Sequence, residues 1–316
     1  MKAKNKLLTL LILSSSAVTT TAIINKIIKV NATKNNCSES PESHIYPWRL
    51  GNIYYTKTGS GKPILLIHDL NSTSSIYEWK DLIPFLAEKY TVYAIDLLGC
   101  GHSEKVNTTY TNYLYVQLIT DFIKSVIGHR TSIITTGESA SIPIMACSNE
   151  PDIFDQIMLI NPLDISEYCR IPGKRARLYK KMIDLPVIGT LLYHIAVSRN
   201  SIESEAKNNY FYNTSNGNPQ WVDSYYESAH LGISPKSFYG SQRCNYTKCN
   251  INNALKKINN SIYLVGGEKA ENISEKLEKY KLVNPAVEIA FIPETKHLPQ
   301  LESPHILAEL IKTYFC

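Results

Sequence analysis

Thr136-Gly137-Glu138-Ser139-Ala140-Ser141 is the stretch that decides the fold. It follows a β-branched run expected as a strand and precedes a segment with helical spacing. A serine at a tight strand-to-helix turn needs small residues two positions before and after it, and Gly137 and Ser141 meet that need. In that geometry the Ser139 hydroxyl projects from the sheet edge beside the N-terminus of the new helix. The stretch predicts a nucleophilic serine, with helix capping as the alternative role.

The sequence on both sides of this turn alternates between strand and helix patterns. Apolar runs predict buried strands at 63–68, 91–96, 131–136, 156–161, 261–265 and 287–292. Helical spacing separates them at 77–89, 110–127, 140–148, 273–281 and 304–315. Strands that alternate with helices imply right-handed crossovers, so we expect an α/β fold with a mostly parallel central sheet flanked by helices.

The expected organisation has an inserted cap. Residues 163–255 lack a strand pattern, have helical character and are rich in tyrosine, so they predict a helical cap between two halves of one sheet. The predicted units are a signal peptide or membrane anchor at 1–30, a polar linker at 31–47, a core at 48–162 and 256–316, and the cap.

The N-terminal segment favours export. Three lysines precede an apolar run from Leu7 to Ile24, which is typical of a signal sequence. Small residues near Ala22 favour cleavage, whereas the lack of a strong A-x-A site favours retention as a membrane anchor. We therefore expect a membrane-anchored or secreted protein with an extracytoplasmic catalytic domain. An amphipathic or disordered tail on a cytoplasmic enzyme is the alternative.

Charge and cysteine content argue against two further classes, nucleic-acid-binding proteins and disulfide-stabilised scaffolds. The chain has 316 residues and a formal charge of +5, but residues 1–36 hold six lysines and no acidic residue. The remainder is close to neutral, so nucleic-acid binding is disfavoured. Seven scattered cysteines do not form a disulfide scaffold, although Cys244 and Cys249 are close enough to pair in an oxidising compartment.

Four sequence blocks, in a fixed order, carry a resemblance to a known family. They are His68-Asp69-Leu70 after the first long strand, residues 96–103 (DLLGCGHS) after the next, the serine turn, and residues 295–304 (TKHLPQLESP) near the C-terminus. Over residues 48–315 the chain resembles the α/β-hydrolase superfamily, in its serine-nucleophile branch with a helical cap.

The resemblance implies a role for each matching residue. Ser139 matches the nucleophile, and His297 matches the general base that accepts its proton. The backbone N–H groups of Leu70 and Ala140 match the oxyanion hole. His68 supports its loop, and neither a cofactor nor a metal ion is implied.

The chain departs from the family pattern at two positions. Asp69 stands where the family usually has glycine, and Ala270 stands where the acid of the triad is expected. Glu271, one residue later, is our first choice for the acid that orients the imidazole, and Asp164 is the runner-up. If neither serves, the enzyme works as a dyad.

These features predict a serine hydrolase that cleaves an ester, thioester or amide through an acyl-enzyme. A small-molecule acyl substrate, mostly apolar, is expected in the cap, with the membrane as a second partner through the N-terminal segment. A serine at 139 argues against enzymes of this fold that use a carboxylate there, such as epoxide hydrolases. The alternative is a catalytically degenerate hydrolase fold that serves as a binding or signalling module, which Ala270 favours.

Overall fold

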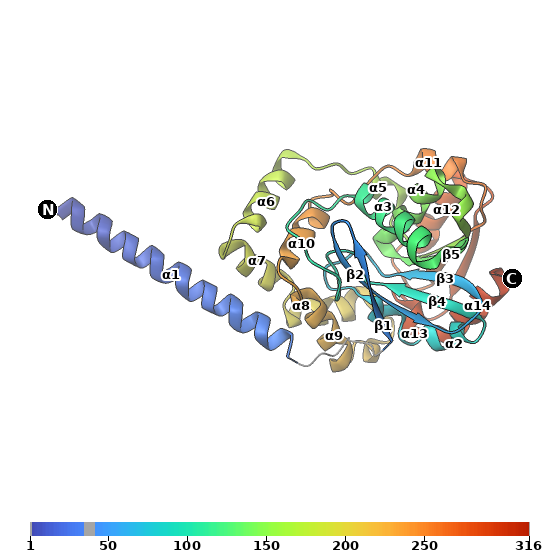
Figure 1. Ribbon diagram of the computed structural model, residues 1–316, viewed down its shortest axis with the longest axis horizontal. Coiled ribbons are helices and arrows are strands. Elements are labelled where there is room, and N and C mark those ends of the chain that lie inside the picture. The colour runs from blue at the N-terminus through green and yellow to red at the C-terminus, as the bar shows by residue number, and fades with distance from the viewer. Residues whose placement is uncertain (1, 35–41, 316) are drawn as a thin grey trace.

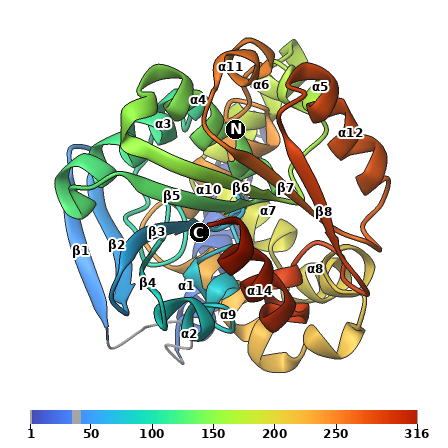
Figure 2. The same cartoon turned by 90° about the vertical axis from the view of Figure 1, so that its right-hand side faces the viewer.

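The structure is a computed structural model that describes residues 2–34 and 42–315, with side chains from residue 15 onward in the first range. Its centre is an eight-stranded sheet with the order β1-β2-β4-β3-β5-β6-β7-β8 (Figure 2). The strands are β1 (Ser43–Trp48), β2 (Gly51–Thr58), β3 (Lys62–Ile67), β4 (Tyr90–Ile95), β5 (Thr131–Thr136), β6 (Phe154–Ile160), β7 (Ile262–Gly267) and β8 (Glu288–Ile292). From β4 to β8 neighbouring strands are parallel, and β1 and β2 add an antiparallel edge. The predicted fold class is confirmed.

Helices cover both faces of the sheet because its central strands bury both faces. In β3, Leu65 and Ile67 pack with one apolar cluster and Ile64 and Leu66 with the other. Figure 2 shows α3, α4 and α12 on one side and α2 and α14 on the other. The core helices are α2 (Ile83–Ala87), α3 (Asn112–Phe122), α4 (Ser141–Asn149), α12 (Ile273–Val283), α13 (Pro299–Glu302) and α14 (Pro304–Tyr314).

The segment between β6 and β7 is helical throughout its regular structure. Its helices are α5 (Ile165–Tyr168), α6 (Lys174–Asp184), α7 (Ile188–Ala196), α8 (Arg199–Glu205), α9 (Pro219–His230), α10 (Pro235–Arg243) and α11 (Asn252–Lys257). Tyr210, between α8 and α9, accepts a hydrogen bond at its carbonyl from the backbone N–H of His297 (3.0 Å). The inserted segment therefore reaches the loops at the carboxyl ends of the strands.

The N-terminal helix α1 (Lys2–Ala32) packs against this inserted segment (Figure 1). Asn25 donates to the carbonyl of Val187 (2.9 Å), and Lys29 donates to that of Gly232 (2.5 Å). The helix extends into the predicted 31–47 linker, of which residues 35–41 lie outside the described part, and β1 begins within it. Among the described side chains, no single helix has the length and apolar content to span a bilayer. The predicted membrane anchor is therefore without support, and its first side chains lie outside the described ones.

The described cysteines are all free thiols. Cys100, Cys147 and Cys244 are buried, and Cys249 is half-buried. Cys244 and Cys249 are therefore unpaired in this structure, and the Cys244 thiol contacts the carbonyl of Ala176 (3.0 Å) instead.

Two buried histidines stack between α7 and α9 and make the cap sensitive to acid. The rings of His194 and His230 lie 4.8 Å apart and are nearly parallel. The pKa of each is lowered to about 4, mainly by burial, and in His194 the positive charge of Lys29 on α1 contributes to this shift. An unfolded histidine has a pKa near 6.5, so the unfolded chain binds protons first as the pH falls. We expect stability to be lost between about pH 6.5 and 4, by up to roughly 3 kcal/mol per histidine.

Thermal denaturation across this pH range measures the effect. The double variant His194→Phe/His230→Phe keeps an aromatic pair but removes both titrating groups, so its melting temperature should vary less with pH than that of the wild type. Parallel curves for the two proteins would show that other groups cause the acid sensitivity.

Candidate active site

The strand-to-helix turn places a glycine, not a serine, at its apex. Strand β5 ends at Thr136, and Gly137 follows with φ of +61°, a conformation that side chains with a Cβ rarely adopt. The 3₁₀ helix η3 (Gly137–Ala140) and then α4 continue from there. The sharp bend that the sequence analysis assigned to Ser139 therefore lies two residues earlier.

Ser139 points into the protein. Its side chain is fully buried, and its hydroxyl donates to the backbone carbonyl of His68 (2.5 Å). The structure thus does not bring it to His297, whose side chain contacts Asp69 instead. Ser139 as nucleophile stays a prediction without geometric support. Gly137 could have indicated the position of the bend from the sequence, since glycine is the residue in this turn that best accepts a positive φ.

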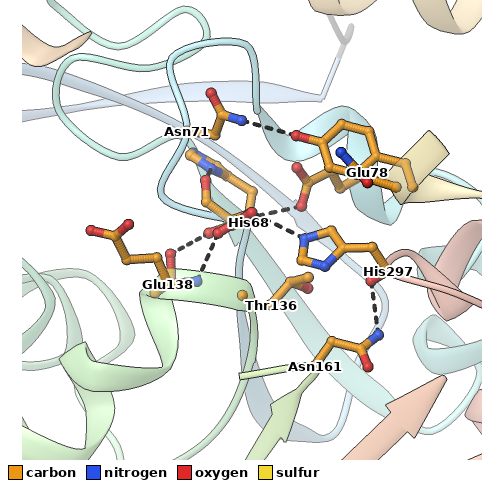
Figure 3. A network of polar contacts seen from close by, with 12 residues as sticks. His68, Asn71, Glu78, Thr136, Glu138, Asn161 and His297 are labelled. Carbon is orange, nitrogen blue, oxygen red and sulfur yellow. Dashed lines mark hydrogen bonds and ion pairs between the residues drawn. The ribbon is translucent and has the colours of Figure 1, made fainter. Parts of the chain in front are cut away.

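The carboxylate of Asp69 fills the space above Gly137. A Cβ built on Gly137 would lie 2.3 Å from Asp69 Oδ1. The same Oδ1 accepts a hydrogen bond from the backbone N–H of Glu138 (2.8 Å), and Oδ2 lies 3.1 Å from His297 Nε2 (Figure 3). One carboxyl group therefore joins the turn to the imidazole, at the point where a nucleophilic side chain would project.

His297 is held by its backbone and by an aromatic ring. It lies in the loop after β8, where its N–H donates to Tyr210 and its carbonyl accepts from Asn161 (Figure 3). Its ring stacks on that of Tyr210, with centroids 5.2 Å apart. Burial opposes protonation, but the hydrogen bond and negative charge of Asp69 outweigh it, so the pKa of His297 is raised. The imidazolium form is favoured next to the carboxylate.

Two further buried carboxyl groups lie near this pair, those of Glu78 and Glu138, and the sequence analysis missed both as site residues. Glu78, in the short helix η1 (Ile76–Trp79), accepts from the backbone N–H of Asp69 (3.0 Å) and from the Tyr225 hydroxyl (3.0 Å). Burial raises the pKa of Glu78. Burial also raises the pKa of Glu138 to about 7, although Thr247 donates to it (2.5 Å). The sequence does not show what either carboxyl group contacts, because the partners Tyr225 and Thr247 are distant from them in the chain.

The predicted oxyanion-hole donors, the N–H groups of Leu70 and Ala140, stay a prediction. With the bend at Gly137, the first amide after it belongs to Glu138, and this N–H already donates to Asp69. Ala140 comes later in η3, where the backbone is helical. Leu70 is buried beside the loop that carries Asp69.

The two predicted triad acids, Glu271 and Asp164, do not take part in the hydrogen bond of the His297 imidazole, whose partner is Asp69. Glu271 is exposed, and it shares with His297 and Ala270 the wall of a hollow of about 300 Å³. Asp164 caps α5 and pairs with Lys279 (2.7 Å). Burial opposes its ionisation, but hydrogen bonds from Lys279 and Ser166 lower its pKa to about 2. Neither carboxylate replaces Asp69 as the observed partner of His297.

A cavity of about 370 Å³ lies between the cap and the loop that follows Asp69. Asn71 and Tyr210 line it and hydrogen-bond to each other (2.9 Å), and Tyr210 also stacks on His297. Gln242 lines it as well and donates to Glu138 (3.1 Å). Asp69 and His297 are not among the lining residues, so the cavity adjoins this pair only through Asn71 and Tyr210, and its lining mixes tyrosine, amide and charged groups with a few apolar ones. This corrects the expectation of a mostly apolar pocket.

A family model described as the alpha/beta hydrolase family matches residues 64–310. The chain belongs to the alpha/beta hydrolase family. The solved structure of a serine hydrolase involved in carbazole degradation superposes with a TM-score of 0.71 at 17% identity, covering 86% of this chain and 98% of that one. The epoxide hydrolase CorEH superposes with a TM-score of 0.69 at 20% identity, over 86% of this chain and 98% of that one. At such identities the structures support the fold alone.

Curated relatives of this alpha/beta hydrolase differ in their reactions. A soluble epoxide hydrolase from Corynebacterium sp. (strain C12) is 28% identical over 34% of this chain and 37% of its own length. A 2-hydroxy-6-oxo-6-(2'-aminophenyl)hexa-2,4-dienoic acid hydrolase from Metapseudomonas resinovorans is 38% identical over 22% of this chain and 25% of its own. A 2-(acetamidomethylene)succinate hydrolase from Mesorhizobium japonicum is 21% identical over 81% of this chain and 88% of its own length. The first two matches span about a third and a quarter of those proteins.

Proposed function

We propose that this protein is a hydrolase that uses the Asp69 carboxylate as its nucleophile and His297 as its acid and base. One observation carries the proposal. The carboxylate occupies the position above Gly137, with Oδ1 on the Glu138 amide and Oδ2 on His297 Nε2. A carboxylate at this position forms an alkyl ester with an electrophilic carbon, which is a recognised form of covalent catalysis.

The first step forms an ester between enzyme and substrate. With an epoxide as substrate, Asp69 Oδ2 attacks a ring carbon and the carbon–oxygen bond of the ring breaks. The released oxygen takes the proton of the His297 imidazolium, whose pKa Asp69 raises despite burial. The products are a hydroxyalkyl ester of Asp69 and a neutral imidazole.

The second step hydrolyses that ester. Neutral His297 accepts a proton from water as the water oxygen attacks the ester carbonyl carbon. The charge that develops on Oδ1 is stabilised by the Glu138 N–H, which is already directed at this atom. The alkoxide leaves and takes the proton back from His297. The protonated Asp69 then transfers its proton to His297, which restores the initial pair.

The substrate class follows from the chemistry and the cavity. We expect a small molecule with an electrophilic carbon, such as an epoxide, and polar groups that match the tyrosine and amide lining of the cavity. The similarity to a soluble epoxide hydrolase supports this choice. An acyl-enzyme at Ser139 has less support, since its hydroxyl is buried and already donates to His68.

A binding or signalling module is the second candidate function. The combination of Gly137 at the bend and Ala270 at the acid position favours it, because both usual side chains of the triad are missing there. In that case the Asp69–His297 pair stabilises the loops and the cavity binds a ligand without turnover.

Trapping the ester distinguishes these possibilities. In the variant His297→Gln the ester with styrene oxide should form more slowly than in the wild type, because the released oxygen must take its proton from water instead of the imidazolium, but it should accumulate, because no base activates water for its hydrolysis. Mass spectrometry of the digested protein should then find the adduct on the peptide that contains Asp69. A fluorophosphonate probe reports on the serine route in parallel. Labelling of Ser139 would favour the acyl-enzyme, and absence of any adduct across an epoxide panel would favour the binding module.

A further inference from the structure

The cap presents an exposed apolar face that the proposed reaction does not use. It is formed by the hairpin of α6 and α7, which we call the α6–α7 hairpin (residues 174–196). Its large apolar side chains on the surface range from 45% exposed for Met182 to 62% for Leu178. Leu185, Ile188 and Ile195 belong to the same set. Large apolar side chains gathered in this way mark an interaction surface more often than chance exposure does.

Basic residues surround these apolar side chains. On α6, Lys174, Arg175, Arg177 and Lys181 are exposed. The acidic residue of that helix, Asp184, is paired with Lys180 (2.8 Å). The face of the hairpin is therefore both apolar and positively charged, the combination that binds amphipathic helices to anionic lipid surfaces.

Helix α1 extends this face. Figure 1 shows α1 and the hairpin on the side of the molecule away from the sheet. Asn25 joins α1 to Val187 at the start of α7, and α1 exposes Ile23 and Ile27 nearby. Helix α6 and the helical segment that begins at Ile188 meet at a bend of 107°. A hairpin bent in this way can lie in the surface of a bilayer.

We propose that the α6–α7 hairpin, with the adjoining part of α1, docks on a bilayer that contains anionic phospholipids. The charge of the face argues for lipid over a second copy of the chain, because two such faces would repel each other. Docking also orients the cavity, since Ala196 and Val197 at the end of α7 line it. This inference does not depend on the catalytic proposal and needs no membrane-spanning helix.

Co-sedimentation of the full chain with vesicles tests the proposal. Vesicles of phosphatidylcholine with about one third phosphatidylglycerol are compared with phosphatidylcholine alone. The variants Leu178→Ser/Ile195→Ser and Arg177→Glu/Lys181→Glu should each lower binding to the anionic vesicles, by about tenfold for the charge reversal. The controls, Leu282→Ser and Lys256→Glu/Lys257→Glu, change exposed apolar and basic residues of the core and should bind like the wild type.

Each other outcome overturns the proposal. Wild-type protein that stays in the supernatant with both vesicles lacks the surface we infer. If all four variants still bound the vesicles like the wild type, the membrane-binding surface would lie in another part of the chain, such as the N-terminal residues. A dimer that forms without lipid and dissociates in the hairpin variants, seen by sedimentation equilibrium, would make a second copy the occupant.

Discussion

Asp69→Asn should abolish turnover of an epoxide substrate, with a fall in kcat of about 10⁴-fold or more. Asparagine keeps the shape of the side chain and a carbonyl oxygen for the Glu138 N–H, but its amide is a poor nucleophile and cannot carry the charge that raises the pKa of His297. The loss should therefore lie in chemistry rather than in folding. Steady-state kinetics measure it, and circular dichroism with a melting curve verifies the fold.

Ser139→Ala is the matched control. Its hydroxyl is buried and donates to the carbonyl of His68, so we expect at most a modest loss of stability, about 1 kcal/mol, and nearly unchanged kcat. The reverse pattern, with an inactive serine variant and an active Asp69→Asn, would return the nucleophile to Ser139 and refute our mechanism.

The sequence predicts the fold because the fold depends on local patterns. Apolar strands such as Ile64–Ile67 alternate with helices of regular spacing, and four motif blocks fix their order. Which residue lies at the bend does not depend on such local patterns. Gly137-Glu138-Ser139 matches the spacing of a serine turn, but the bend is set by which residue adopts a positive φ, and in this chain that residue is Gly137.

The Asp69–His297 pair, which takes the place of the usual triad, could not be predicted from motifs because its residues are distant in sequence. In the sequence, Asp69 in the loop after β3 shows only as a departure from the glycine that the family usually has there. In three dimensions it contacts both Glu138 and His297. The two departures, Asp69 and Ala270, then become related to the glycine at the bend. Gly137 makes room for the Asp69 carboxylate, the carboxylate contacts the imidazole directly, and Ala270 is tolerated because His297 has this other acidic partner.

Restoring the usual arrangement should create a serine nucleophile where the wild type has none. In the double variant Asp69→Gly/Gly137→Ser, removal of the carboxylate vacates the space 2.3 Å from the position of the new Cβ, and His297 Nε2 loses its present partner. The new hydroxyl then projects from the bend toward the imidazole, with the Glu138 N–H free to act as an oxyanion donor. A fluorophosphonate probe should label the double variant at position 137 and leave the wild type unlabelled.

Single and triple variants make this test stringent. Gly137→Ser alone should stay unlabelled or fold poorly, because its Cβ meets Asp69 Oδ1. Adding Ala270→Asp supplies the acid that the family pattern expects, and it should accelerate p-nitrophenyl acetate hydrolysis by the double variant by roughly 10²- to 10⁴-fold, since an acid fixes the productive imidazole tautomer. A folded double variant that no probe labels would mean that His297 does not reach a side chain at position 137, and the claim that the Asp69 carboxylate occupies the place of a nucleophile at this bend would fail with it.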